Sequence, residues 1–171
     1  MRNGTHLGEP LEPDFDVVDY LWEISDHWFH VGEHERCIEL SHYVVALDPT
    51  FVEAYLIAAW LEDSADRYDD ARATLQRGIA ANPEHYQCYF DLGWYHFKHK
   101  DFAGALPWYQ KAAALDCPPD VPRMAAHTLE RLGRLNECLD TWRKLQRRYP
   151  EDQVVLNNLR RVEAKLKAPN L

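Results

Sequence analysis

Packing positions recur at every third or fourth residue along most of the chain. Two examples come from its first and middle parts: Leu21, Ile24, Ser25 and Trp28, and then Leu92, Gly93 and His96. This spacing places side chains on one face of an α-helix and predicts helices. Four aspartates precede helical stretches and are the predicted N-caps: Asp16, Asp101, Asp120 and Asp152.

The same pattern returns with a period of 34 residues. The segment Leu47-Asp48-Pro49 has its counterpart in Ala81-Asn82-Pro83, and other positions fall into register with it. Small residues, expected where two helices cross closely, form two columns: Cys37, Ala71, Ala105 and Cys138, and then Ser25, Ala59, Gly93 and Ala126. A further column marks the turn inside each unit: Gly32, Asp66, Lys100 and Gly133. Repeats of this length predict a stack of helix pairs.

These columns resemble the tetratricopeptide repeat, a helix-turn-helix unit of 34 residues. The third unit matches its pattern best, through Tyr89, Leu92, Gly93, Phe102, Ala105, Tyr109, Ala112 and Leu115. There are three local departures: Glu62 replaces the usual aromatic, Gly78 replaces the usual Ala, and Pro107 lies inside a helix, where it removes a hydrogen bond.

The resemblance implies an all-α fold, a right-handed α-solenoid of antiparallel helix pairs. Four units are expected at about 15–49, 50–83, 84–118 and 119–150. Residues 1–14 are expected to form a flexible N-terminal arm, and 168–171 a tail. Between the units and the tail, 151–167 carries Val155, Leu159, Val162 and Leu166 on one side and charges on the other. We expect this segment to be a helix that caps the stack.

In this family the first helix of each pair lines the concave side, where partner peptides usually bind. The register assigns ten residues of this chain to that surface: Trp22, Asp26, Phe29, Leu56, Trp60, Phe90, Trp94, Phe97, Arg123 and His127. An exposed aromatic strip rimmed by acids is typical of a binding site. The expected partner is a protein or peptide segment with apolar anchors and basic residues. The alternative is burial of these aromatics, since a register error of one residue would turn Trp60 or Trp94 inward.

Some members of the family bind the acidic C-terminal tail of heat-shock chaperones, which ends in EEVD, through Lys and Asn residues. At the matching positions this chain has Trp22, Asp26, Ile57, Gln87 and Asp91, and no Lys. Because acidic residues would repel the carboxylates of the tail, we expect EEVD-tail chaperones not to bind.

Composition and charge narrow the class of protein further. The 171 residues carry 19 basic and 28 acidic side chains, a net charge of −9, which argues against nucleic acid as a general partner. No apolar run is long enough to span a membrane or to form a signal peptide, so we expect no membrane insertion and a cytoplasmic location. The charge divides unevenly, with −14 on residues 1–122 and +5 on 123–171.

Chemistry-bearing motifs are sparse. The four cysteines lie far apart and form no zinc or disulfide pattern. His27, His30 and His34 share a helical spacing, but Gly32 is expected to end that helix before His34. No nucleophile, phosphate-loop or metalloprotease motif occurs. We therefore expect no metal, no cofactor and no enzymatic activity.

The leading hypothesis is an interaction scaffold or adaptor whose concave groove holds a partner segment. One alternative is head-to-tail self-assembly into a homo-oligomer, driven by the uneven charge. Another is a chaperone of the type III secretion class, whose members are of similar length but have three repeats.

Overall fold

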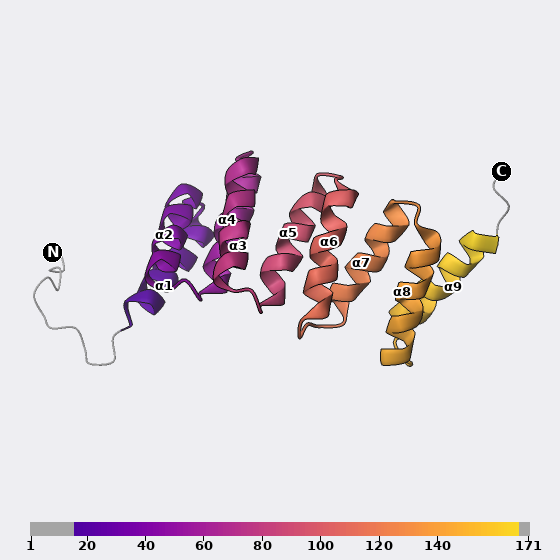
Figure 1. The fold of residues 1–171 in the computed structure, drawn as a ribbon. Helices are drawn as coiled ribbons and strands as arrows, with labels where there is room; N and C mark the ends of the chain where they lie inside the picture. Colours follow the sequence, from indigo (N-terminus) through magenta and orange to yellow (C-terminus); the bar gives the residue numbers. More distant parts are fainter. Residues whose placement is uncertain (1–15, 168–171) are drawn as a thin grey trace, which may run out of the picture.

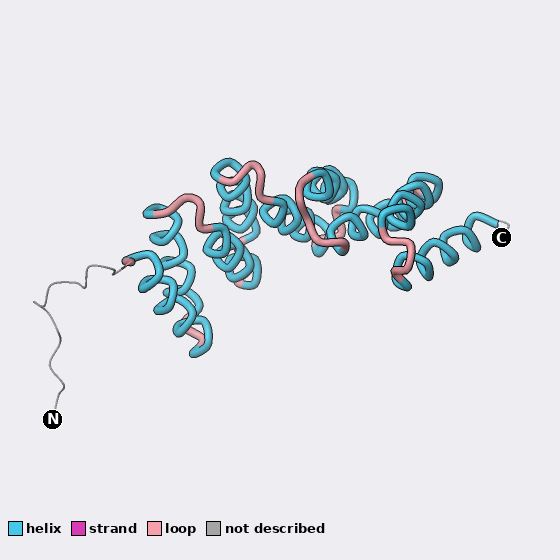
Figure 2. Tube along the Cα trace, turned by 90° about the horizontal axis from the view of Figure 1, so that it is seen from below, coloured by secondary structure: helices cyan, strands magenta, loops and turns pink. Residues whose placement is uncertain are grey.

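The computed structural model of the protein describes residues 16–167, which form a row of helices with residue 16 at one end and residue 167 at the other (Figures 1 and 2). Within these residues the helices are α1 (Val17–Val31), α2 (His34–Leu47), α3 (Val52–Ser64), α4 (Tyr68–Ala81), α5 (Tyr86–Lys98), α6 (Phe102–Ala114), α7 (Asp120–Arg131), α8 (Leu135–Arg148) and α9 (Gln153–Lys167). The predicted all-α solenoid is confirmed. The predicted arm at 1–14 and the tail at 168–171 lie outside the described residues.

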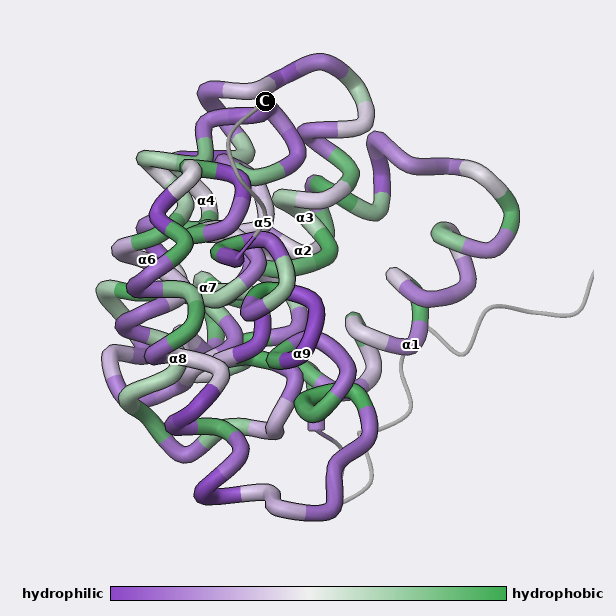
Figure 3. Tube along the Cα trace, turned by 90° about the vertical axis from the view of Figure 1, so that its right-hand side faces the viewer, coloured by the Kyte–Doolittle hydropathy of each residue, from purple (hydrophilic) through white to green (hydrophobic). Residues whose placement is uncertain are grey.

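Contacts along the row are local. Each helix packs against its neighbours in the sequence, and α3 also contacts α5. Hydrophobic and hydrophilic residues are interspersed along the helices, as Figure 3 shows. Because the hydrophobic ones recur at helical spacing, an isolated helix would leave an apolar face in water. Stacking buries that face against the next helix, and the stability of such an array is approximately a sum over neighbouring contacts.

Both predicted columns of small residues are buried. Cys37, Ala71, Ala105 and Cys138 are at most 1% exposed, and the second column from Ser25 to Ala126 is also buried. Gly93 shows how tight the packing is, because a Cβ atom there would lie 2.9 Å from two ring carbons of Tyr109. Small side chains at these positions therefore set how closely the helices approach.

The predicted turn column is confirmed by the backbone. Gly32, Asp66, Lys100 and Gly133 all adopt positive φ angles, of 82°, 60°, 63° and 71°. After each of them, the next residue donates a backbone N–H to the carbonyl five residues earlier, at 2.9 Å in all four turns. This is the Schellman arrangement, which satisfies the last carbonyls of the first helix in each pair.

Three of the four predicted N-caps are confirmed. Asp16 accepts from the N–H of Val18, Asp101 from that of Gly104, and Asp152 from those of Val154 and Val155. Asp120 as a cap is wrong, because α7 begins at Asp120 itself. Pro119 occupies the cap position, and its side chain has no oxygen to accept a hydrogen bond.

Two of the three departures from the repeat pattern have a place in the packing, and the third is exposed. Glu62 is buried in α3 and lies 2.9 Å from Nε2 of His42. Gly78 fits closely against Tyr55, since a Cβ there would lie 3.2 Å from the tyrosine Cβ and Cγ atoms. Pro107 is exposed, and α6 continues through it.

The largest buried cluster lies in the C-terminal half. It joins α6, α7, α8 and α9 around Trp142 and includes Val155, Leu159 and Val162 of the last helix. The apolar side of α9 therefore packs as expected for a capping helix, and Leu166 alone of its four predicted apolar residues stays exposed.

The turn geometry predicts opposite effects of two substitutions. Lys100 carries a Cβ in a left-handed conformation, so Lys100→Gly should raise the free energy of unfolding by about 0.5–1 kcal/mol. Gly133→Ala should lower it by about 1 kcal/mol, although the added Cβ would meet nothing within 4 Å. Urea denaturation of both variants checks this. Equal destabilisation by both substitutions would contradict the claim that the positive φ angle at these positions determines their effect on stability.

Candidate functional site

Three cavities lie in series along the helices that come first in each pair. We call the surface formed by α1, α3, α5, α7 and the capping helix α9 the first-helix groove. Its N-terminal cavity lies between α1 and α3, its central cavity between α3 and α5, and its C-terminal cavity among α5, α7 and α9. These three cavities contain eight of the ten residues that the sequence assigned to a partner-binding surface.

The N-terminal cavity is the smallest, at about 110 Å³, and is mainly apolar. It is lined by Trp22, Asp26, Phe29 and Ile57, together with Ser25, His30 and Cys37. Trp22 also packs against Phe51, with ring centroids 5.0 Å apart. Asp26 is exposed at the rim and lies 3.5 Å from Nδ1 of His30. This end of the groove combines aromatic walls with an acidic rim.

The central cavity, of about 230 Å³, contains the two tryptophans on which the binding hypothesis depends. Trp60 is 51% exposed and Trp94 is 45% exposed, and both line this cavity. Leu56, Ala59 and Leu75 form apolar parts of the wall, while Asp63, Asp91, Tyr95 and Lys98 provide polar groups. Trp60 follows Ala59 in the sequence, and Trp94 follows Gly93. Because each small residue faces a neighbouring helix, the indole that follows it lies on a different face of its own helix, toward the cavity.

Asp91 is a partly buried carboxylate at this cavity. Burial raises its pKa from 3.8 to about 6. Within residues 16–167 no group forms a hydrogen bond or ion pair with its carboxylate. Burial, and then the negative charge of Asp91, raise the pKa of Tyr109. The Tyr109 hydroxyl is buried and also has no hydrogen-bond partner in the described part of the chain. A negative charge is therefore held at the groove without a counter-ion.

Asp63, the other acid of the central cavity, is in the opposite situation. It is buried, forms a short ion pair with Lys98, and lies 2.7 Å from Nε2 of His99. Burial alone would raise its pKa, but the bonds from Lys98 and His99 outweigh this and hold the pKa below its usual value. The cation nearest to the cavity is thus already engaged by Asp63.

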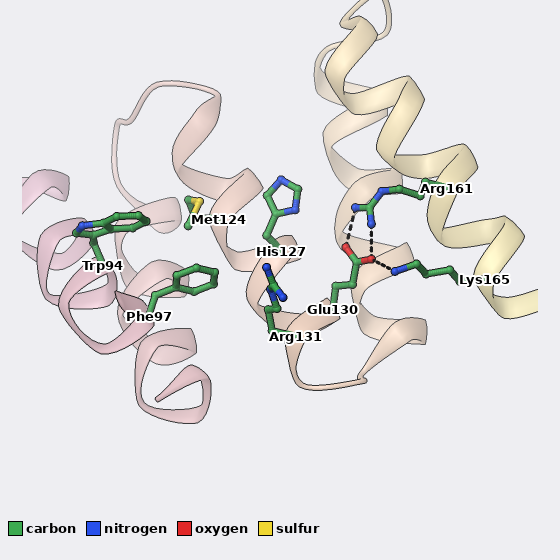
Figure 4. A pocket seen from close by; sticks show the side chains of 8 residues that line it. All are labelled: Trp94, Phe97, Met124, His127, Glu130, Arg131, Arg161 and Lys165. Carbon is green, nitrogen blue, oxygen red and sulfur yellow. Dashed lines mark hydrogen bonds and ion pairs between the residues drawn. The ribbon is translucent and has the colours of Figure 1, made fainter. Parts of the chain in front are cut away.

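The C-terminal cavity is the largest, at about 670 Å³ (Figure 4). On one side Trp94 and Phe97 of α5 stack with centroids 5.9 Å apart and an interplanar angle of 14°. Met124, His127 and Arg131 of α7 lie opposite them, as Figure 4 shows. Burial, and then the charge of Arg161, lower the pKa of His127, so this imidazole is neutral at pH 7.

A charge cluster ties the capping helix to this cavity. Glu130 of α7 accepts two hydrogen bonds from Arg161 and one from Lys165 (Figure 4). These partners lower the pKa of Glu130 to about 2 despite its burial. Arg131 adds a third cation, so one acid faces three bases in the lining. The groove is acidic at its N-terminal end and basic at its C-terminal end.

Two of the predicted contact residues lie outside the three cavities. Phe90 is partly buried against the core, with its ring centroid 5.5 Å from that of Tyr109. Arg123 forms an ion pair with Asp152, at the start of α9. Helix-to-helix packing and the attachment of the capping helix account for these two positions.

The basic end of the groove was missed by the sequence reasoning. Arg161 and Lys165 come from the capping helix, which the repeat pattern treats only as a cover. Their spacing of 31 and 35 residues from Glu130 gives no local signal of a contact. These cations also weaken the electrostatic argument against EEVD tails at this end, so that exclusion stays a prediction.

Metal-ligating and membrane-spanning features are missing from the described part of the chain. Residues 16–167 contain no group of three His, Cys, Asp or Glu side chains placed to hold a metal ion. The four cysteines are free thiols, and three of them are buried. No helix in this range is long and apolar enough to cross a membrane.

The repeat family is supported by comparison with known proteins. The family model described as "Tetratricopeptide repeat" matches residues 56–122, which include α4, α5 and α6. This part of the chain is thus similar to the tetratricopeptide-repeat family. A curated relative, anaphase-promoting complex subunit 3 of Schizosaccharomyces pombe, is 25% identical over 84 residues, which are 49% of this chain and 13% of that protein. The match thus covers a small part of its length.

Solved tetratricopeptide-repeat structures have the same fold. The crystal structure of MamA superposes with a TM-score of 0.66 at 18% identity, covering 85% of this chain and 80% of that one. YrrB, described as a TPR protein with an unusual peptide-binding site, superposes with a TM-score of 0.65 at 20% identity, and the match covers 91% of this chain and 80% of YrrB. TTC0263, a thermophilic TPR protein of Thermus thermophilus, superposes with a TM-score of 0.63 at 17% identity, and the match covers 90% of this chain and 84% of TTC0263. At these identities the likeness shows the fold.

The unpaired carboxylate predicts a stability that depends on pH. Because the folded-state pKa of Asp91 lies above its unfolded value, its charge destabilises the fold above about pH 6, and this cost disappears toward pH 4. Asp91→Asn should therefore raise the free energy of unfolding by about 1–2 kcal/mol at neutral pH. Denaturation of both proteins at the two pH values measures the difference.

The control for this prediction is Asp116→Asn, which removes an exposed charge outside the groove. It should leave the stability nearly unchanged at either pH. A gain for Asp91→Asn that is as large near pH 4 as near neutrality would contradict burial of the charge as its cause.

Proposed function

We propose that this protein is a non-enzymatic scaffold that binds an extended or helical segment of a partner protein in the first-helix groove. Tetratricopeptide-repeat proteins typically mediate interactions between proteins. The observation that carries the proposal for this chain is the exposure of Trp60 and Trp94 at one cavity, because exposed aromatic side chains that gather at one place are typical of an interaction surface. Buried on binding, such side chains provide most of the affinity of many interfaces.

The charge along the groove adds to the expected partner chemistry. Asp26 and Asp91 favour basic residues over the N-terminal and central cavities, together with apolar side chains against the aromatic walls. Arg131, Arg161 and Lys165 favour an acidic residue over the C-terminal cavity. A segment of mixed charge would thus bind in one direction. Nucleic acid and membrane insertion form no part of the proposal, and the cytoplasmic location stays a prediction.

Selection from a library of random peptides tests this function without a known partner. Peptides retained by the full chain should be rich in apolar residues. Their dissociation constants, measured by calorimetry, should rise about tenfold or more for Trp60→Ala and for Trp94→Ala, the loss expected for a central anchor. Tyr43→Ala, which removes an exposed aromatic on α2 outside the groove, is the control and should change affinity less than twofold.

Affinities unchanged in the Trp60/Trp94 double variant would overturn the proposal. So would a selection that retains no peptide.

A second candidate function, head-to-tail self-association, is favoured by the two ends of the stack. α1 leaves Val17 and Val31 about half exposed, and α9 does the same with Val154. Residues 1–122 carry a net charge of −14 and residues 123–171 one of +5. The C-terminal end of one copy would therefore attract the N-terminal end of another.

Light scattering measures this second function. The mass should exceed that of one chain at low salt and fall as salt screens the charges. Lys167→Glu, at the exposed end of α9, should lower the low-salt mass, whereas Lys100→Glu, at an inner turn, should not. A mass of one chain at low salt would exclude charge-driven association.

A further inference from the structure

The central cavity has the composition of a site for one basic side chain. Its volume of about 230 Å³ is lined by two exposed indoles, by apolar side chains and by the carboxylate of Asp91. Aromatic faces attract an ammonium or guanidinium group and pack well against the methylene groups that carry it. A carboxylate beside them provides the counter-charge.

Asp91 is available for such a ligand because the protein's own cation is engaged elsewhere. Lys98 lines the same cavity, two helical turns after Asp91, but its Nζ atom is bound to Asp63. His99 binds the second oxygen of Asp63, which fixes that carboxylate in place. Within residues 16–167 Asp91 thus remains unpaired, and its partial removal from water is uncompensated.

We propose that the central cavity receives a lysine or arginine side chain of the bound segment, with Asp91 as its counter-ion and with Trp60 and Trp94 against its stem. This inference rests on the proposed function, which it deepens by naming one residue of the partner by its chemistry. An incoming cation would pair a charge that the free protein holds at a cost. Asp91 therefore favours binding at the expense of stability.

Three small probes test the site directly. Nα-acetyl-lysine N-methylamide and its arginine equivalent carry the cation, whereas the norleucine equivalent has a similar stem and no charge. The lysine and arginine probes should shift the indole N–H signals of Trp60 and Trp94 in NMR titrations of the labelled full chain. The norleucine probe should bind at least several-fold more weakly, because it gains neither the ion pair nor the cation–π attraction.

Matched charge removals locate the counter-ion. Asp91→Asn should weaken the lysine and arginine probes about tenfold and leave the norleucine probe unchanged. Asp116→Asn removes an exposed charge outside the groove and should change affinity less than twofold. Equal losses in both variants would overturn the subsite, because they would indicate general attraction by an acidic surface.

The pH dependence of binding gives a second readout. Protonation of Asp91 removes the counter-charge, so affinity for the lysine probe should fall between about pH 7.5 and 5. The other titratable groups facing Asp91 are Asp63 from α3, Cys88, Tyr95 and Lys98 from α5, and Tyr109 from α6; α4 contributes the apolar Leu75. In Asp91→Asn the affinity should stay flat, and a fall as steep as in the wild type would contradict the assignment.

The outcomes separate this inference from the proposed function. Selected peptides that depend on Trp60, combined with no preference for the lysine probe over norleucine, would overturn the subsite alone. A lysine probe that binds through Asp91, combined with no retained peptide, would overturn the scaffold function and leave a site for free cationic ligands.

Discussion

The helices of this protein pack most closely at the columns of small residues, and this contact governs how each helix is oriented. Ala59 is buried, and Gly93 lies so close to the Tyr109 ring that an added Cβ would come within 2.9 Å of it. Close packing of this kind fixes the rotation of each helix about its own axis. The residue after each small one, Trp60 or Trp94, is thereby turned toward the groove, where the indole remains half exposed. The exposure of these two indoles at the groove thus follows from the packing of the core.

The acids of α3 and α5 illustrate how one fold gives similar groups different roles. Asp63 is buried and satisfied by Lys98 and His99, and it stabilises the contact between the helices. Asp91 lies on the same groove without a partner in the described part of the chain, and burial raises its pKa. Asp63 is thus neutralised within the molecule, whereas Asp91 is the acid for which we proposed a cationic ligand. Pairing, more than position along the groove, distinguishes the two.

The capping helix has two functions in this arrangement. Its apolar side, through Val155 and Val162, closes the largest core cluster. Its polar side brings Arg161 and Lys165 to Glu130 and makes one end of the groove basic. The helix that ends the stack therefore also sets the direction of charge along the surface, which a repeat unit alone could not do.

The helix pairs, the small columns, the positions of the four turns and three of the N-caps could be predicted from the sequence. Each depends on contacts within one repeat or between adjacent repeats, which a period of 34 residues places in register. The register also assigns ten residues to the groove, and eight of them line its three cavities. Three features became visible in the folded chain alone: Phe90 and Arg123 serve packing, Asp91 lacks a partner within residues 16–167, and Arg131 and α9 make one end basic. Side-chain pairing across helices depends on distances that no spacing along the chain encodes.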